Sequence, residues 1–315
     1  MFKINTHQFG LLENIIITNP NHGIELNIIG GFGAMINKFI VNHSPFSFIS
    51  GYQNSDELLH THPYYSRSAK LFPFPNRLKH GRYQYAGKHY QLPANFSWSQ
   101  HAVHGLLYNQ PFQLVDSQAT EQYAQITLRF NTDCLHPGYP FAFQIDIRYL
   151  LQLNGLLSCT TTVRNDGSCS LPFGDAWHPY FALGVPLNQC TLTMPACHEV
   201  KHVDDLPSGD LQPCSRFVEG ATLNNQSLNH CFLFKGDQSI DLALQRHDQR
   251  AALLYQQDSN YPYLQLYTPS DESSIAIEPM TCPADAFNNQ LGLIHLAPHQ
   301  QQSFRWQCQA IYKPY

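Results

Sequence analysis

Apolar and polar residues alternate with a period of two along several segments of this chain, the pattern of β-strands that have one buried face. Residues 141–149 show it best: Phe141, Phe143, Ile145, Ile147 and Tyr149 alternate with more polar or smaller residues. Asn154-Gly155 follows, a strong short signal for a hairpin turn, so residues 156–163 are predicted to return as the partner strand. The same alternation predicts strands at residues 240–244 and 304–312.

Helix signals are few. Ser55–Leu59 predict the start of one short helix with Ser55 as its N-cap, and Pro63 is expected to limit its length. Gly30-Gly31-Phe32-Gly33 is not followed by the Lys-Ser/Thr of a phosphate-binding loop, so it is predicted to be a turn between strands. Because the 21 prolines and 18 glycines are spread along the chain and no repeat or linker divides it, we expect one all-β domain over residues 1–315, a large antiparallel sandwich.

The composition narrows the class of protein. Apolar residues make up 43% of the chain, charged residues only 13%, and the net charge is −5. A nucleic-acid-binding protein needs a basic field, and a membrane span needs about 20 apolar residues in a row, so neither partner is expected. The N-terminus lacks the apolar core of a signal peptide, and the nine cysteines form no CxxC pair. We therefore expect reduced thiols and a cytoplasmic location.

A carboxylate and an imidazole are the candidates for acid/base chemistry. Glu278 ends an alternating segment in which Ile275 and Ile277 face one side and Ala276 shares the side of Glu278. Pro179 follows His178 in a bulky, apolar context, so this imidazole is expected to be partly buried, and a histidine titrates near neutral pH. The same patterns also fit a solvated glutamate at a strand end and a structural histidine.

Other histidines and one arginine could complete a site. Prolines 73 and 75 stiffen the loop before Arg77, whose guanidinium can hold sugar hydroxyls or a carboxylate. His101 and His104 are three residues apart, so on a strand they point to opposite faces and do not converge on a metal. His60 and His62 have no third metal ligand near them in the sequence, so they are interpreted as surface or loop residues. No metal is expected.

The order and spacing of several segments resemble the aldose 1-epimerase (galactose mutarotase-like) family over nearly the whole chain. These segments are FPFPNRL (72–78), with glycine-containing stretches at 81–83 and 87–92, then HAVHG (101–105), HPYF (178–181), LNHCFLF (228–234), YLQLYT (263–268) and AIEPMTCPADAFN (276–288). The family has Asp where Asn229 stands, and many members have Asn in place of Trp177. With EPM at 278–280, these departures are typical of a divergent bacterial branch.

The resemblance implies a β-supersandwich and an isomerase that interconverts the α and β anomers of a free aldose such as glucose or galactose. It gives Glu278 the role of general base on the C1 hydroxyl and His178 that of general acid on the ring oxygen. Arg77 and His104 match substrate-binding positions, and the same role is expected of Asn76, Asn229 and Gln265. Since neither hydride nor phosphoryl moves, no cofactor is expected. The expected partner is a monosaccharide, bound by a monomer or homodimer.

Two alternatives stay open at this point. Arg77, Lys79, Arg82 and Lys88 form a modest basic cluster that could receive the phosphate of a hexose 6-phosphate, although a solvated basic loop has the same pattern. Asn229 in place of the family's aspartate also fits a non-catalytic sugar-binding module on the same fold, because a neutral amide makes weaker hydrogen bonds to hydroxyls than a carboxylate does.

Overall fold

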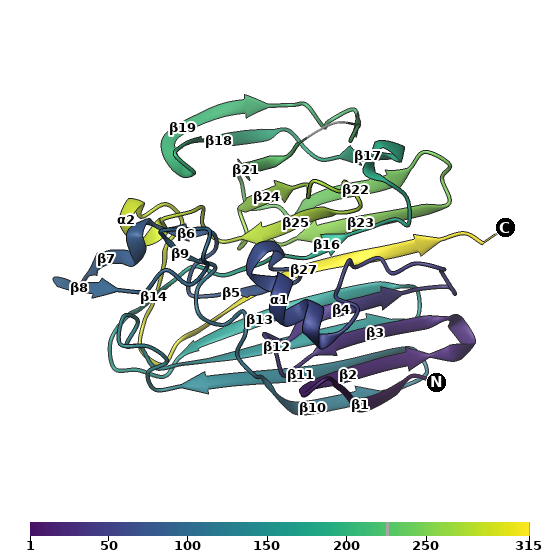
Figure 1. Cartoon of the computed structure of the whole chain (residues 1–315), viewed down its shortest axis with the longest axis horizontal. Helices are drawn as coiled ribbons and strands as arrows, with labels where there is room; N and C mark the ends of the chain where they lie inside the picture. The colour runs from purple at the N-terminus through teal and green to yellow at the C-terminus, as the bar shows by residue number, and fades with distance from the viewer. Residues whose placement is uncertain (225–226, 315) are drawn as a thin grey trace.

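The computed structural model describes residues 1–224 and 227–314, and most of them lie in antiparallel β-sheets (Figure 1). Within these ranges the α-helices are α1 (Ser55–Tyr65) and α2 (Ala286–Asn289), and single 3-10 turns lie at η1 (Pro20–His22), η2 (Lys79–Gly81) and η3 (Leu187–Gln189). The predicted all-β, antiparallel class is confirmed.

A nine-stranded sheet forms the largest layer. Its strands, in spatial order, are β10 (Gln113–Ala119), β11 (Tyr123–Thr132), β12 (Phe143–Gln152), β13 (Leu156–Asn165), β27 (Gln301–Tyr312), β23 (Ala251–Gln257), β22 (Ile240–Arg246), β17 (Cys190–Thr193) and β20 (Ala221–Thr222). The alternating segments of the sequence are β12, β22 and β27, and their apolar positions, such as Ile145, Leu242 and Trp306, are buried. The predicted strands are therefore confirmed.

The predicted hairpin joins β12 to β13. Leu151 pairs with Leu157, which leaves a short loop between the strands. Gly155 ends this loop with a φ of 82°, in the left-handed region that residues with a side chain rarely adopt. The turn between β3 and β4 falls at Gly30–Gly33, again as predicted.

Two further sheets pack against this layer (Figure 1). A four-stranded sheet contains β1 (Lys3–Phe9), β2 (Leu12–Asn19), β3 (Ile24–Ile29) and β4 (Met35–Ile40). An eight-stranded sheet has the order β19 (Leu206–Cys214), β18 (Cys197–Val203), β21 (Asn229–Leu233), β24 (Tyr263–Tyr267), β25 (Ile275–Met280), β15 (Ala176–Trp177) and β5 (Lys70–Leu71), with β16 (Tyr180–Phe181) also paired to β25. Phe181 of this sheet packs on Tyr255 and Trp306 of the large sheet, with ring centroids 6.0 and 6.3 Å apart.

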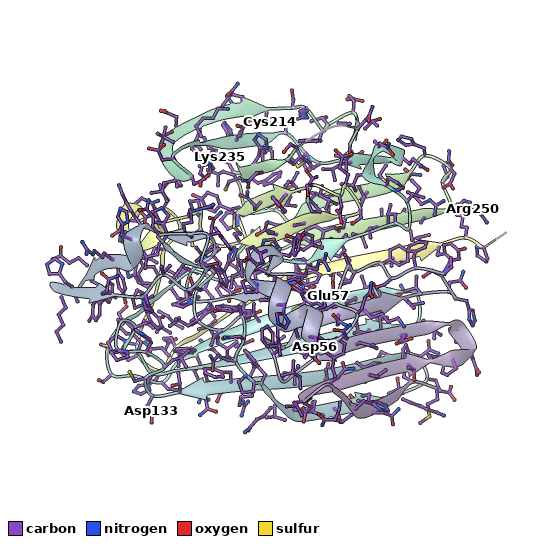
Figure 2. All side chains as sticks on the ribbon, viewed as in Figure 1. Asp56, Glu57, Asp133, Cys214, Lys235 and Arg250 are labelled. Carbon is purple, nitrogen blue, oxygen red and sulfur yellow. The ribbon has the colours of Figure 1, made fainter. Side chains whose placement is uncertain are left out.

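Three two-stranded ribbons complete the fold. They are β14 (Leu171–Phe173) with β26 (Ile294–Leu296), β6 (Arg77–Leu78) with β9 (Ala102–Val103), and β7 (Arg82–Tyr85) with β8 (Lys88–Gln91). Side chains fill the space between the sheets, while the labelled Asp133 lies at the periphery (Figure 2). Burial of this apolar interior is the main source of stability.

The predicted helix forms, but both of its expected ends are wrong. Asn54, not Ser55, is the N-cap, because the backbone of Asn54 is extended and its Oδ1 accepts a hydrogen bond of 2.9 Å from the Glu57 N–H. The helix also continues past Pro63 to Tyr65. Proline removes one hydrogen bond from a helix, but the chain still closes its last turn, where the N–H of Ser66 donates to the His62 carbonyl at 2.8 Å.

All nine cysteines lie in the described ranges, and each is a free thiol, as predicted. Neither described α-helix has the length and the apolar character that a membrane crossing requires.

Candidate active site

The register of the eight-stranded sheet places His178 opposite Glu278. Strand β15 ends just before His178 and β16 begins just after Pro179, and both pair with β25. Ala176 is opposite Met280 and Tyr180 is opposite Ala276. The same register places position 178 opposite position 278. The Nε2 of His178 lies 3.4 Å from the Oε1 of Glu278. Two residues remote in sequence are thus cross-strand neighbours.

Glu278 lies inside β25, which corrects the prediction of a strand end. Pro279 is also part of this strand, a position that proline rarely takes in a central strand. The N–H of Ile277 donates to the Pro179 carbonyl at 3.1 Å. By the same register Pro279 lies opposite Trp177, the last residue of β15, so the donor that proline lacks is missing at the point where the neighbouring strand ends.

Burial dominates the electrostatics of this pair. The exposed fraction of Glu278 is 3% and that of His178 is 7%, so the solvated-glutamate alternative is wrong and the histidine is more buried than predicted. Loss of solvent raises the pKa of Glu278 well above its usual 4.5 and lowers the pKa of His178 to about 3. Once ionised, Glu278 is therefore a stronger base than an exposed glutamate, and the neutral imidazole can donate an N–H.

His104 and Asn76 are fixed by reciprocal hydrogen bonds. The N–H of His104 donates to the Asn76 carbonyl at 2.8 Å, and the N–H of Asn76 donates to Nδ1 of His104 at 3.3 Å. Because Nδ1 accepts and burial lowers the pKa of His104 well below 6.5, the ring is neutral and carries its proton on Nε2. The ring of His104 lies edge-on to that of His178, with centroids 5.3 Å apart. His104 is thus a preset donor beside the acid/base pair.

Arg77 is held from three directions. Its Nη1 donates to the Oδ1 of Asn76 at 2.9 Å, and its Nη2 lies 3.2 Å from the Oδ2 of Asp205, at the tip of the β18–β19 hairpin. The guanidinium carbon also lies 5.7 Å from the ring centroid of Trp98. These contacts orient the guanidinium at the mouth of the site, as the stiff loop before it predicts.

Gln265 and Asn229 extend the row of polar side chains across the sheet. Gln265 is opposite Glu278 on β24, and its Nε2 donates to the Oδ1 of Asn229 on β21 at 2.8 Å. The Oε1 of Gln265 is buried and has no hydrogen-bond partner among the described residues. A buried acceptor without a partner is costly, so this oxygen is poised to receive a donor from a ligand.

All seven predicted site residues line one cavity of about 240 Å³. This is slightly smaller than the clefts that bind drug-sized molecules, and it suits a small polar ligand. The other lining residues are Tyr64, Tyr65, Ser66, Trp98, Val103, Tyr180 and Tyr267.

No specific sequence pattern indicates these additional lining residues. Trp98 is 41% exposed although tryptophan is usually well buried, and its Nε1 donates to the Pro63 carbonyl at 2.6 Å. Tyr180 and Tyr267 flank the small Ala276, and their rings pack edge to face with centroids 6.2 Å apart. Only the general excess of aromatic residues, 13% of the chain, pointed to rings at a ligand site.

Other predictions for histidines and basic residues meet mixed outcomes. His62 was interpreted as a surface or loop residue, and this is wrong: it lies in α1 and is 1% exposed. His101 accepts from the N–H of His80 at 2.9 Å and does not line the cavity that contains His104. Of the basic cluster, Arg77 lines the cavity, whereas Lys79, Arg82 and Lys88 do not. Within the described ranges, no three His, Cys, Asp or Glu side chains group as metal ligands.

Comparisons with known proteins agree with this architecture. Residues 14–309 match the family model described as aldose 1-epimerase. The chain is 30% identical to the uncharacterized protein YihR of Escherichia coli over 249 residues, which are 73% of this chain and 75% of YihR. Its fold matches a galactose mutarotase-like protein from Clostridium acetobutylicum, with a TM-score of 0.86, 19% identity and 99% of each chain covered.

A second structure gives the same result for the fold. The galactose 1-epimerase of Lactobacillus acidophilus superposes with a TM-score of 0.81 at 16% identity, over 100% of this chain and 99% of that one. The predicted mutarotase-like sandwich is therefore confirmed, and the chain belongs to the aldose 1-epimerase family.

Proposed function

We propose that this protein is an aldose 1-epimerase that accelerates the exchange between the α and β anomers of a neutral free aldose. The observation that carries the proposal is the 3.4 Å contact between the buried Glu278 carboxyl and the His178 imidazole at one cavity. The two oxygens that must exchange protons during ring opening, O1 and O5, are bonded to the same carbon. A base and an acid this close together can each contact one of them.

The proposed reaction moves protons between four atoms. The carboxylate of Glu278 takes the proton of the O1 hydroxyl, while Nε2–H of His178 donates to O5 and the C1–O5 bond breaks. Because Oε1 and Nε2 lie 3.4 Å apart, the proton that Glu278 took from O1 passes to Nε2 once that nitrogen has given its own proton to O5, so the neutral imidazole and the carboxylate are both restored. Rotation about C1–C2 and the reverse transfers close the ring as the other anomer.

A neutral sugar fits the charges of the site better than a phosphorylated one. Arg77 is the one residue of the basic cluster that lines the cavity, and its guanidinium is already paired with Asp205 at 3.2 Å. An added phosphate would compete with this carboxylate. Sugar hydroxyls can instead accept hydrogen bonds from Arg77 and from Nε2–H of His104, and donate to the Oε1 of Gln265.

The direct test is the rate of anomer exchange. We expect purified protein to accelerate exchange between the H1 resonances of α- and β-glucose or galactose, measured by NMR saturation transfer, well above the buffer rate. His178→Ala should abolish the acceleration, and glucose 6-phosphate should be exchanged more slowly than glucose. Sugar binding without any acceleration would overturn the proposal and favour a binding module on the same fold.

A further inference from the structure

Three buried polar atoms around His178 have no hydrogen-bond partner among the described residues. They are Nδ1 of His178, Oγ of Ser68 and Nε2 of His62. Ser68 and His62 are each only 1% exposed. Leaving one such atom unpaired costs about 1–3 kcal/mol, so three of them in one region indicate a shared arrangement that satisfies them together.

Ser68 is tied directly to the backbone of His178. The N–H of Ser68 donates to the His178 carbonyl at 2.8 Å. The N–H of His178 donates in turn to the carbonyl of Ala69, the residue after Ser68, at 3.1 Å. Ser68 has a φ of 53°, a left-handed conformation that is uncommon for serine and that the two hydrogen bonds help to hold. The hydroxyl is therefore confined to the neighbourhood of the catalytic candidate.

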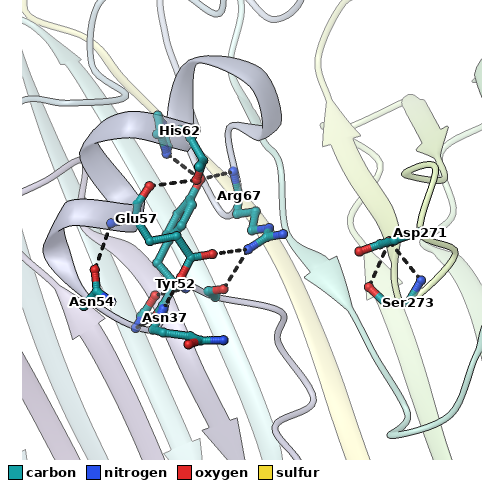
Figure 3. A network of polar contacts seen from close by, with 11 residues as sticks. Asn37, Tyr52, Asn54, Glu57, His62, Arg67, Asp271 and Ser273 are labelled. Carbon is teal, nitrogen blue, oxygen red and sulfur yellow. Dashed lines mark hydrogen bonds and ion pairs between the residues drawn. The ribbon is translucent and has the colours of Figure 1, made fainter.

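The hydrogen bonds of Tyr52 determine where His62 carries its proton (Figure 3). The backbone N–H of Arg67 donates to the Tyr52 hydroxyl at 3.1 Å, and the same oxygen lies 2.9 Å from Nδ1 of His62. Burial raises the pKa of Tyr52, so the hydroxyl keeps its proton and donates a hydrogen bond to Nδ1 of His62. Burial and the nearby His178 lower the pKa of His62 to about 3, so the ring is neutral and its own proton is on Nε2.

The hydrogen-bonding capacities of the three unpaired atoms are complementary. Nε2–H of His62 is a donor, the hydroxyl of Ser68 can accept and donate, and Nδ1 of a neutral His178 accepts when its proton is on Nε2. His62 is also packed in place by its neighbours, because its ring stacks on Tyr108 with centroids 5.8 Å apart and an interplanar angle of 17°.

We propose that His62 and Ser68 are positioning residues that select the Nε2–H tautomer of His178, through a hydrogen-bonded relay from Tyr52 to His62, Ser68 and Nδ1 of His178. A small side-chain rotation or one internal water closes the relay. It points the proton of His178 at the cavity, where the proposed reaction needs a donor. The catalytic consequence rests on the proposed function, whereas the tautomer does not depend on it.

The test reads the tautomer of His178 directly. In ¹⁵N-labelled protein at neutral pH, long-range ¹H–¹⁵N spectra should show His178 with a protonated Nε2 and an unprotonated Nδ1, its signals being assigned by their loss in His178→Gln. In His62→Phe, which keeps a ring but removes the donor, we expect a mixture of both tautomers. In His62→Gln the amide can accept from Tyr52 and donate onward, so the single tautomer should return.

Kinetics give a second readout if the enzyme is active. His62→Phe should lower kcat by about tenfold, the scale seen when a partner that orients a histidine is lost. KM should stay nearly unchanged, and His62→Gln should recover most of the lost kcat. Phe32→Leu is the matched control: its ring packs edge-on at 5.0 Å from His62 without touching the hydrogen bonds, so it should change stability and not the tautomer.

Three spectral outcomes would overturn the relay: a protonated Nδ1 in the parent protein, an unchanged tautomer in His62→Phe, or a change in Phe32→Leu as large as in His62→Phe. If the parent protein exchanged no sugar, the proposed function would fail, and the spectra would still decide on the relay.

Discussion

Glu278→Gln is expected to reduce kcat for anomer exchange by about 10²–10⁴-fold, the usual contribution of a positioned general base. Glutamine has nearly the same shape and can still accept a hydrogen bond from O1, but its amide cannot take the proton. The side chain is 3% exposed, so a neutral replacement avoids burying a charge and should leave the fold as stable as before or more stable. Steady-state NMR exchange rates and thermal unfolding measure the two effects.

The matched control is the same substitution on the surface. Glu219 is exposed and far in sequence from every predicted site residue except Asn229, and it does not line the cavity. Glu219→Gln should leave both kcat and the unfolding temperature unchanged. Full activity of Glu278→Gln beside full activity of this control would remove the base from the proposed reaction.

Asp175→Ala is expected to destabilise the fold by about 3–5 kcal/mol, because it leaves a buried lysine without its counter-charge. Lys70 and Asp175 are both fully buried, with the Nζ 2.5 Å from the Oδ1, and the hydroxyl of Tyr261 donates to the Oδ2 at 2.6 Å. Burial opposes both charges, lowering the pKa of Lys70 and raising that of Asp175. Lys70 also lies 4.8 Å from the ring centroid of Trp177, next to His178.

Replacing both partners should cost less than the sum of the single changes. In Lys70→Met/Asp175→Leu no unpaired charge stays buried, so urea unfolding should show much of the stability restored. The half-exposed pair Arg129–Asp146 is the control, and Arg129→Met should cost about 1 kcal/mol or less. Single variants at Lys70 and Asp175 that are no less stable than this control would show that the buried pair is not a determinant of the fold.

Much of the fold could be predicted because the pattern is local. The alternation that became β12, the turn at Gly155 and the long β27 each depend on neighbours a few residues away. The predicted start of α1 was wrong because it depends on competition between adjacent residues. Asn54 is the N-cap, although Ser55 is also a residue type that caps helices well. Propensity alone does not decide between two residues that both cap well.

The site depends on contacts that no local pattern contains. The identities of His178 and Glu278 were predicted, but their contact is produced by the register of β15, β16 and β25. His62 was misjudged as a surface or loop residue because no local pattern shows that α1 continues through it and turns its ring into the interior. Trp98 lines the cavity from a loop whose path is set by tertiary packing, so no periodicity could have indicated it.

A crystal structure of the protein soaked with glucose or galactose would test the central claim most directly. The proposed chemistry requires O1 of the sugar within hydrogen-bond distance of the Glu278 carboxyl and O5 within the same distance of Nε2 of His178. A pyranose bound in the 240 Å³ cavity with its anomeric carbon turned away from both groups, or bound outside this cavity, would contradict it.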